Sequence, residues 1–125
     1  MSDTVVDERV RVLVVEDSDD QRELLRAYFE RAGCAVATAH NAEDAIPAYQ
    51  AESPELAVVD LLLPGMDGWA LIRKLKVEQP DCSIVVTSVL DSREFPEADA
   101  FLPKPFTGAQ IIQVLKDLIP RWRPV

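Results

Sequence analysis

The stretch at residues 56–68, LAVVDLLLPGMDG, joins an uninterrupted apolar run to a turn sequence and the start of a helix. Apolar runs without polar alternation are typical of strands covered on both faces of a sheet, so we expect a strand over residues 56–61. Asp67 follows the turn and is a favourable N-cap for a helix that continues through Leu71 and Leu75. Asp60 therefore stands at the end of a buried strand, where the chain turns towards a helix.

Four more short apolar runs alternate with segments of helical period. The expected strands are VRVLVV at 10–15, CAVAT at 34–38, SIVVT at 83–87 and AFL at 100–102. The helix signals are Ser18 with Gln21 as a capping box and Gly33 as a stop, Asn41 as the cap of a helix that runs to about residue 51, and Thr107 with Gln110. Pro47 should kink or strain the second helix. This alternation predicts the α/β class, with a doubly wound five-stranded parallel sheet of strand order 2-1-3-4-5.

Length and charge limit what the protein can be. A chain of 125 residues suits one domain with a single core. The net charge of −9 disfavours direct binding to nucleic acid, which needs a basic patch. No apolar run is long enough to span a membrane, and the first nine residues carry four charged side chains instead of a signal-peptide core. Cys34 and Cys82 are too far apart for a metal or redox motif, so we expect buried, reduced thiols and a cytoplasmic location.

Polar residues follow the ends of four of the expected strands. Glu16 and Asp17 close the first strand and Asp60 the third, while Thr87 closes the fourth and Lys104 follows the fifth. The carboxyl ends of parallel strands lie along one edge, and open α/β sheets bind ligands there, at the point where the strand order reverses. Strands one and three are neighbours at that point, so the acidic pair should face Asp60.

Three carboxylates at this edge would repel one another. Each like pair at ~4 Å costs roughly 4 kcal/mol at an effective dielectric constant of about 20, so the site should either protonate one acid or bind a cation. A small number of hard oxygen ligands suits Mg²⁺, which often bridges to a phosphate. With Lys104 as a fixed positive charge and Thr87 as a hydroxyl donor, the set predicts phosphoryl transfer to Asp60.

Each of these residues also has a purely structural interpretation. Glu16 and Asp17 could begin a helix and favour its dipole, and Asp60 could be a turn-forming aspartate. Thr87 could be an ordinary β-branched strand residue, and Lys104 a solvated loop lysine. Their convergence on one edge of the sheet favours the functional interpretation.

The motifs VLVVED, VVDLLLPGMDG, VVTS and FLPKPF stand in the order found in the receiver domains of two-component response regulators. This resemblance spans about residues 10–119 and implies the flavodoxin-like receiver fold. It implies that Asp60 accepts a phosphoryl group from a sensor histidine kinase or a histidine phosphotransfer protein. It also implies that Asp17, Asp60 and the backbone carbonyl of Leu62 bind Mg²⁺, with Glu16 acting through water. Such a receiver catalyses its own phosphorylation and dephosphorylation and is otherwise not an enzyme.

The same resemblance assigns residues to a conformational switch. Thr87 would supply the hydroxyl that moves to the phosphoryl group, and Ser88 would present its backbone N–H to it. Lys104 would pair with the phosphoryl oxygens, across a cis bond to Pro105. Phe101 resembles the aromatic residue that turns inward on activation.

The resemblance also suggests how the chain is organised. We expect a flexible N-terminal segment at 1–9, a receiver domain at 10–120 and a short tail at 121–125, with no output domain. The protein would then be a stand-alone receiver, similar to the chemotaxis type. Its changed surface would be read by a downstream protein whose identity the sequence does not give, with no nucleic acid or membrane as a partner.

The segment before the fifth strand departs from the family pattern. Thr87 and Lys104 are 17 positions apart, which leaves only residues 89–99, with Pro96 among them, to cross between two strands. We expect the fourth helix to be absent or reduced to about one turn. The protein could therefore signal through an altered face that uses Trp122 and the last helix, or the deletion could be harmless. Otherwise Trp69 and Trp122 should pack in the core or at helix ends.

Three other functions compete with the receiver hypothesis. A phosphorylation-independent pseudo-receiver would keep the fold as a protein-interaction module. An aspartyl-phosphate hydrolase of the haloacid-dehalogenase type needs a second acid two residues after its nucleophile, where this chain has Leu62. A nucleotide-binding Rossmann domain needs a glycine-rich loop after the first strand, which is missing here.

Overall fold

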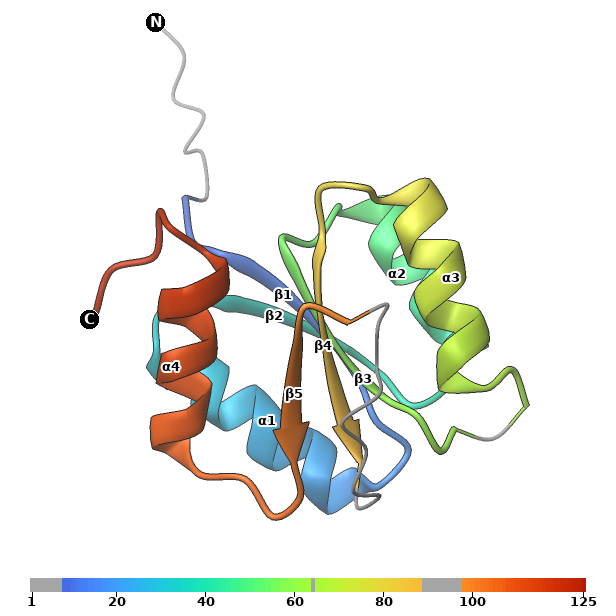
Figure 1. Cartoon of the computed structure of the whole chain (residues 1–125), viewed down its shortest axis with the longest axis horizontal. Coiled ribbons are helices and arrows are strands. Elements are labelled where there is room, and N and C mark those ends of the chain that lie inside the picture. The colour runs from blue at the N-terminus through green and yellow to red at the C-terminus, as the bar shows by residue number, and fades with distance from the viewer. Residues whose placement is uncertain (1–7, 64, 89–97) are drawn as a thin grey trace, which may run out of the picture.

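The computed structural model describes residues 8–63, 65–88 and 98–125 and shows a parallel sheet between two layers of helices (Figure 1). The strand order is β2-β1-β3-β4-β5, as the sequence predicts. The strands are β1 (Arg11–Val15), β2 (Ala35–Ala39), β3 (Leu56–Asp60), β4 (Ser83–Ser88) and β5 (Ala100–Pro103). All four pairings between neighbouring strands are parallel.

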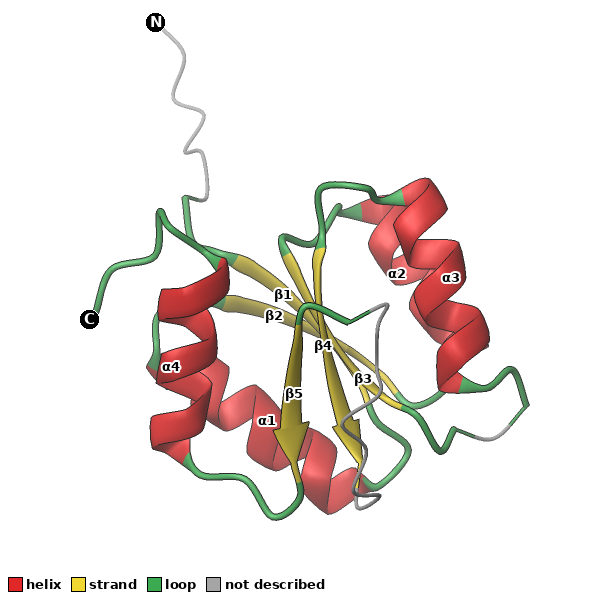
Figure 2. Cartoon of the chain, viewed as in Figure 1, coloured by secondary structure: helices red, strands yellow, loops and turns green. Residues whose placement is uncertain are grey.

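Helices cover both faces of the sheet (Figure 2). The described helices are α1 (Asp19–Arg31), α2 (Ala42–Ala51), α3 (Gly68–Glu78) and α4 (Gly108–Leu118). Alternate residues of each central strand enter two separate cores: Val12 and Val14 pack with α1 and α4, whereas Leu13 and Val15 pack with α2 and α3. Burial on both faces explains why these strands are apolar without alternation.

Side chains cap the helices where the sequence predicts caps. The side chains of Ser18, Asn41, Asp67 and Thr107 each accept a hydrogen bond from the backbone N–H three residues on, and Thr107 forms the full capping box with Gln110. The box predicted for α1 is only half formed, because the backbone N–H of Ser18 donates to Oε1 of Glu16 instead of to Gln21. The helix α2 continues through Pro47 without a break.

Several element boundaries differ from the sequence prediction by one residue. Cys34 is outside β2 because its N–H closes the end of α1, donating to the carbonyl of Phe29 at 3.0 Å, while Gly33 takes a positive φ of 86°. At the other edge β4 and β5 are each one residue longer than predicted, because Ser88 pairs with Pro103. The strand β3 ends at Asp60, one residue earlier than predicted.

The expected loss of a helix between the fourth and fifth strands falls on residues 89–97, which lie outside the described residues. The predictions for the cysteines and tryptophans are confirmed. Cys34 and Cys82 are buried and free, and burial raises the pKa of Cys34 to about 11 and that of Cys82 to about 12. Trp69 packs against the core beneath α2 and α3. Within the described part of the chain, no helix has the length and apolar character needed to cross a membrane.

Trp122 fixes the end of the chain to the rest of the domain. Its side chain is 7 % exposed, and Nε1 donates a hydrogen bond of 2.8 Å to the carbonyl of Ala32. Trp122 shares the lining of a pocket with Val10 and Gly33, which precede the starts of β1 and β2. It therefore lies at the end of the sheet opposite the carboxyl ends of the strands, where the sequence predicts the site, and a role for it in signalling stays a hypothesis.

We predict that Trp122→Phe lowers the free energy of unfolding by about 1–3 kcal/mol, because it removes the donor to a buried carbonyl while keeping an aromatic ring. Urea denaturation followed by circular dichroism measures this change. An unchanged midpoint would show that the hydrogen bond to Ala32 contributes nothing to stability.

Candidate functional site

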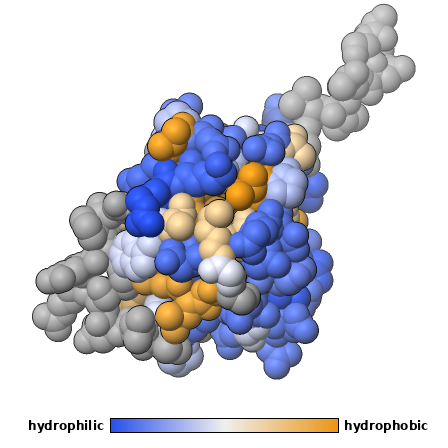
Figure 3. Space-filling view, turned by 90° about the vertical axis from the view of Figure 1, so that its right-hand side faces the viewer, coloured by the Kyte–Doolittle hydropathy of each residue, from blue (hydrophilic) through white to orange (hydrophobic). Residues whose placement is uncertain are grey.

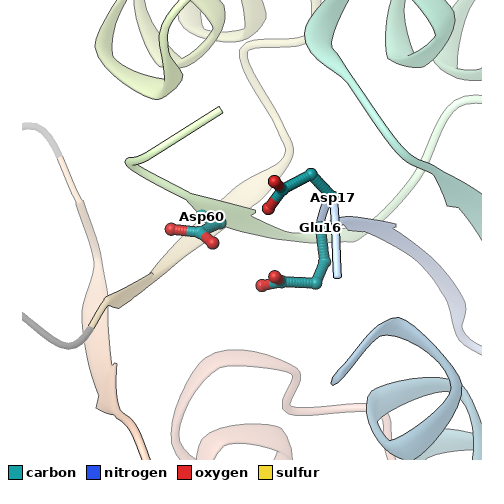
Figure 4. A group of neighbouring side chains, drawn as sticks. All are labelled: Glu16, Asp17 and Asp60. Atoms are coloured by element: carbon teal, nitrogen blue, oxygen red, sulfur yellow. The ribbon is translucent and has the colours of Figure 1, made fainter. Parts of the chain in front are cut away.

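Three carboxylates meet where β1 and β3 end (Figure 4). Val15 pairs with Val59, so the next residues along the two strands, Glu16 and Asp60, come side by side. Each of Glu16, Asp17 and Asp60 offers an oxygen atom, and these oxygens lie within 4.8 Å of one another. Glu16 is fully buried and Asp60 is 4 % exposed, whereas Asp17 faces solvent. The structure thus brings together the acidic cluster that the sequence predicts.

Lys104 lies against two of these carboxylates. Its Nζ donates a hydrogen bond of 3.0 Å to Oδ2 of Asp60 and forms an ion pair of 2.9 Å with Oε2 of Glu16. The backbone places it there, because the N–H of Lys104 donates to the carbonyl of Ser88 at the end of the β4–β5 pairing. The peptide bond to Pro105 is cis, as the family resemblance implies.

Burial and charge set the protonation of this cluster in opposite directions. Burial raises the pKa of Glu16, and the charge of Asp60 raises it further, while Lys104 partly offsets both. Burial alone would lower the pKa of Lys104, but its bonds to Glu16 and Asp60 outweigh that effect and raise it. One ammonium group is thus shared by two buried carboxylates, which leaves the cluster with excess negative charge.

Thr87 supplies a buried hydroxyl beside Asp60. It is the direct partner of Asp60 in the β3–β4 register and is fully buried. Its Oγ1 has no hydrogen-bond partner among the described residues. Buried polar atoms are normally paired, so an unpaired hydroxyl at this position suggests that a group absent from the structure bonds to it. Ser88, the next residue, is 1 % exposed and accepts the backbone hydrogen bond from Lys104.

The loop after β3 is folded tightly around Asp60. The N–H of Leu62 donates to Oδ1 of Asp60 at 3.0 Å, while the Leu62 side chain is 55 % exposed. Gly68 begins α3 so close to the strand that a Cβ atom there would lie 2.5 Å from the carbonyl oxygen of Asp60. Only glycine fits this approach, which explains the final residue of the PGMDG motif.

The predicted switch residue Phe101 lies on β5, paired with Val86, one position before the level of Thr87. It is half-buried and packs against the core that α2 and α3 cover. It also borders an open groove between β5 and α4, lined in part by Gln110 and Val114. Its movement on activation stays a prediction.

Two contacts of the site have no signal in the sequence. Nη1 of Arg22, on α1, donates to the backbone carbonyl of Glu16 at 3.0 Å and so supports the turn that carries the acidic pair. Glu43, on α2, accepts a hydrogen bond from the loop after β3. Both are charged residues within helices, and the helical pattern of the sequence does not indicate which charged side chains contact a distant segment.

The sequence of this chain matches the model of a known protein family. Residues 12–116 match the response regulator receiver domain. The chain belongs to this family. Receivers are signalling modules of two-component systems that interact with histidine kinases, rather than enzymes in the ordinary sense.

Similar proteins carry receivers within longer chains. The chain is 36 % identical over 100 residues to a cyclic di-GMP phosphodiesterase of Thermotoga maritima, covering 75 % of this chain and 27 % of that protein. It is 31 % identical over 120 residues to the transcriptional regulatory protein CseB of Streptomyces avermitilis, covering 92 % of this chain and 51 % of that protein. The receiver therefore spans about half or less of these relatives, and its organisation as a stand-alone protein stays a prediction.

A solved structure has the same extent as this receiver. A putative response regulator from Chloroflexus aurantiacus superposes with a TM-score of 0.82 at 25 % identity, covering 91 % of this chain and all of that one. The fold and the order of its elements are therefore shared with a solved member of the family.

We predict that Glu16→Gln stabilises the metal-free receiver at neutral pH. Because burial raises the pKa of Glu16 in the folded state, folding favours the protonated form, and stability falls as the pH rises from the usual carboxyl value of 4.5 through the raised pKa. The amide cannot ionise, so the difference between variant and wild type should grow across that window.

Urea denaturation at a series of pH values in EDTA measures this difference. Glu52→Gln, the same substitution at an exposed position, serves as the control. A Glu16→Gln variant that is less stable than wild type at pH 7 would contradict the prediction, and would mean that the ion pair with Lys104 outweighs burial.

Proposed function

We propose that this receiver accepts a phosphoryl group on Asp60, in a Mg²⁺-dependent reaction, from a phosphohistidine on a sensor histidine kinase or a histidine phosphotransfer protein. The observation that carries the proposal is the unpaired hydroxyl of Thr87, buried directly beside Asp60. A phosphoryl group on Asp60 would bring acceptor oxygens to that hydroxyl. The cytoplasmic location expected from the sequence belongs to the same proposal.

The transfer needs few chemical groups from the protein. A carboxylate oxygen of Asp60 attacks the phosphorus, the P–N bond to the donor imidazole breaks, and the imidazole leaves with the bonding electron pair and takes up a proton. Positioning and charge neutralisation dominate such a reaction. Asp60 is well positioned for the attack, because its carboxylate accepts hydrogen bonds from Lys104 and from the N–H of Leu62.

The donor set fits a hard divalent cation. Asp17, Asp60 and the carbonyl of Leu62 would hold Mg²⁺, with Glu16 acting through water, and all are oxygen ligands of the kind that this ion prefers. When bound, the ion supplies positive charge against the phosphoryl oxygens. The excess negative charge of the cluster, which Lys104 alone does not balance, supports this assignment.

Lys104, Thr87 and Ser88 would hold the transferred group. Lys104 already contacts Asp60 and would pair with a phosphoryl oxygen, while the N–H of Ser88 would donate to another. An unpaired buried hydroxyl costs about 1–3 kcal/mol, so a hydrogen bond from Thr87 to the phosphoryl group would favour the phosphorylated conformation. We propose that this gain drives the switch, with Phe101 following Thr87, and that a downstream protein reads the changed surface.

Phosphorylation at Asp60 is tested with a small phosphodonor. Incubation with acetyl phosphate and Mg²⁺ should give an acid-stable, base-labile adduct, seen by intact-mass spectrometry, that disappears in EDTA and in Asp60→Asn. Asp20→Asn, at an exposed position of the first turn of α1, should still form it. An adduct that persists in Asp60→Asn would place the acceptor elsewhere, and its absence from wild type would favour the pseudo-receiver alternative.

Thr87→Val tests the role of the hydroxyl separately. The substitution replaces an unpaired buried group by a methyl of similar size, so it should raise the free energy of unfolding of the unphosphorylated protein by about 1 kcal/mol. It should also reduce the gain in thermal stability that phosphorylation gives to the wild type. A destabilised Thr87→Val, or an undiminished gain, would show that the hydroxyl is already satisfied.

A further inference from the structure

The loop between β3 and α3 is fixed at both of its ends by contacts within the same segment. Near its start, the N–H of Leu62 donates to Asp60 at 3.0 Å, and the flanking side chains of Leu61 and Leu63 are buried. Near its end, the side chain of Asp67 caps α3 by accepting from the N–H of Ala70 at 2.7 Å. Between these ends the Met66 side chain packs, partly buried, against the core that α2 and α3 cover, and the backbone of residues 65 and 66 needs a further contact to fix it.

Glu43 of α2 holds this middle part. Its Oε1 accepts a hydrogen bond of 2.8 Å from the backbone N–H of Met66, 23 residues away in sequence. Gly65, beside it, has a φ of 72°, and a Cβ atom there would lie 3.0 Å and 3.1 Å from the two carboxylate oxygens of Glu43. The carboxylate therefore packs directly against the loop backbone, and a hydrogen bond to an ionised acceptor is stronger than a neutral one.

The contact bridges two segments on the side of the molecule shown in Figure 3, where α2 and α3 form a mainly hydrophilic surface. Glu43 belongs to the first turn of α2, whose start is fixed because the side chain of Asn41 accepts from the N–H of Asp44 at 2.7 Å. The loop is thus tied to a helix that packs on the sheet core rather than to another loop.

We propose that Glu43 is a positioning residue for the metal- and phosphoryl-binding site, and that it acts by fixing the loop that carries the Leu62 carbonyl. The inference rests on the proposed function, since it concerns the loop that would bind Mg²⁺. Leu62 lies between two anchors, Asp60 on one side and the Glu43–Met66 hydrogen bond on the other. Without the second anchor the loop samples more backbone conformations, and metal binding must then order it.

Three variants separate this role from charge and from general stability. Glu43→Ala removes the acceptor, whereas Glu43→Gln keeps an oxygen that can accept from Met66. Asp44→Ala is the matched control, because it removes the same charge from the neighbouring exposed position, whose side chain contacts His40. Each variant is measured for amide exchange of Met66 by NMR without metal, for Mg²⁺ affinity by calorimetry, and for the free energy of unfolding in EDTA.

We expect Glu43→Ala to speed the exchange of the Met66 amide and to weaken Mg²⁺ binding by about tenfold, the lower end of the range for residues that support metal ligands. Glu43→Gln, which keeps a neutral acceptor for the Met66 N–H, should recover most of both losses, and Asp44→Ala should change neither property. The unfolding free energies of the glutamine and alanine variants should differ much less than their Mg²⁺ affinities.

Three results would overturn the inference while leaving the proposed function intact. The first is Mg²⁺ affinity in Glu43→Ala equal to that of a wild type that binds the ion. The second is an equal loss in Asp44→Ala, which would assign the effect to charge. The third is rapid exchange of the Met66 amide in the wild type, which would refute only the role of the Glu43–Met66 hydrogen bond. If the wild type binds no Mg²⁺ and forms no adduct, the proposed function fails and this inference fails with it.

Discussion

Two buried carboxylates, those of Glu16 and Asp60, share the single ammonium group of Lys104 at distances of 2.9 Å and 3.0 Å. The parallel sheet places these groups together, because β1, β3 and β5 all end at the same edge of the sheet. The central strands β1 and β3 are held in place by hydrophobic cores on both faces. Moving the two acids apart would require repacking those cores. The repulsion therefore remains in the folded state, where a cation or a phosphoryl group can relieve it.

At the opposite end of the strands, Arg121 and Glu55 belong to a network of paired polar groups. Arg121 donates to both carboxylate oxygens of Glu55, at 2.6 Å and 2.7 Å, and to the carbonyls of Glu8 and Arg9. The hydrogen bonds from Arg121 hold the pKa of Glu55 below its usual range, and burial only partly offsets them. Near these contacts Trp122 pairs its indole N–H with Ala32. Arg121, Glu55 and Trp122 are thus paired, whereas at the carboxyl ends of the strands the buried hydroxyl of Thr87 has no partner among the described residues. A buried polar atom without a partner is typical of a functional site.

Much of this arrangement could be predicted from the sequence, because it follows from patterns that are local in the chain. The runs around Val14, Val58 and Val85 identify strands covered on both faces, and the polar residues that end or follow them fall at the ligand-binding edge by topology alone. Ser18, Asn41, Asp67 and Thr107 each cap a helix as their positions predict. The start of β2 differs from the prediction because the N–H of Cys34 bonds to α1 instead of joining the sheet, and β4 and β5 are longer because Ser88 pairs with Pro103.

The contacts that could not be predicted join polar residues of separate segments. Arg22 reaches the carbonyl of Glu16 and Glu43 reaches the N–H of Met66, and neither contact leaves a periodic or spaced signal in the chain. The reason for Gly68 is also spatial, since it lies against the backbone of Asp60. Such contacts depend on how α1, α2 and α3 are placed on the sheet, which local patterns do not determine.

We propose that the acids, Thr87 and Lys104 form one site for Mg²⁺ and a phosphoryl group on Asp60. A crystal structure with Mg²⁺ and beryllofluoride, which mimics a phosphoryl group on an aspartate, would test this proposal. We expect an ion bound by Asp17, Asp60 and the Leu62 carbonyl at about 2.0–2.1 Å, with Oγ1 of Thr87 and Nζ of Lys104 bonded to the fluorides. An ion bound elsewhere, or a Thr87 hydroxyl that still has no partner beside an occupied Asp60, would contradict it.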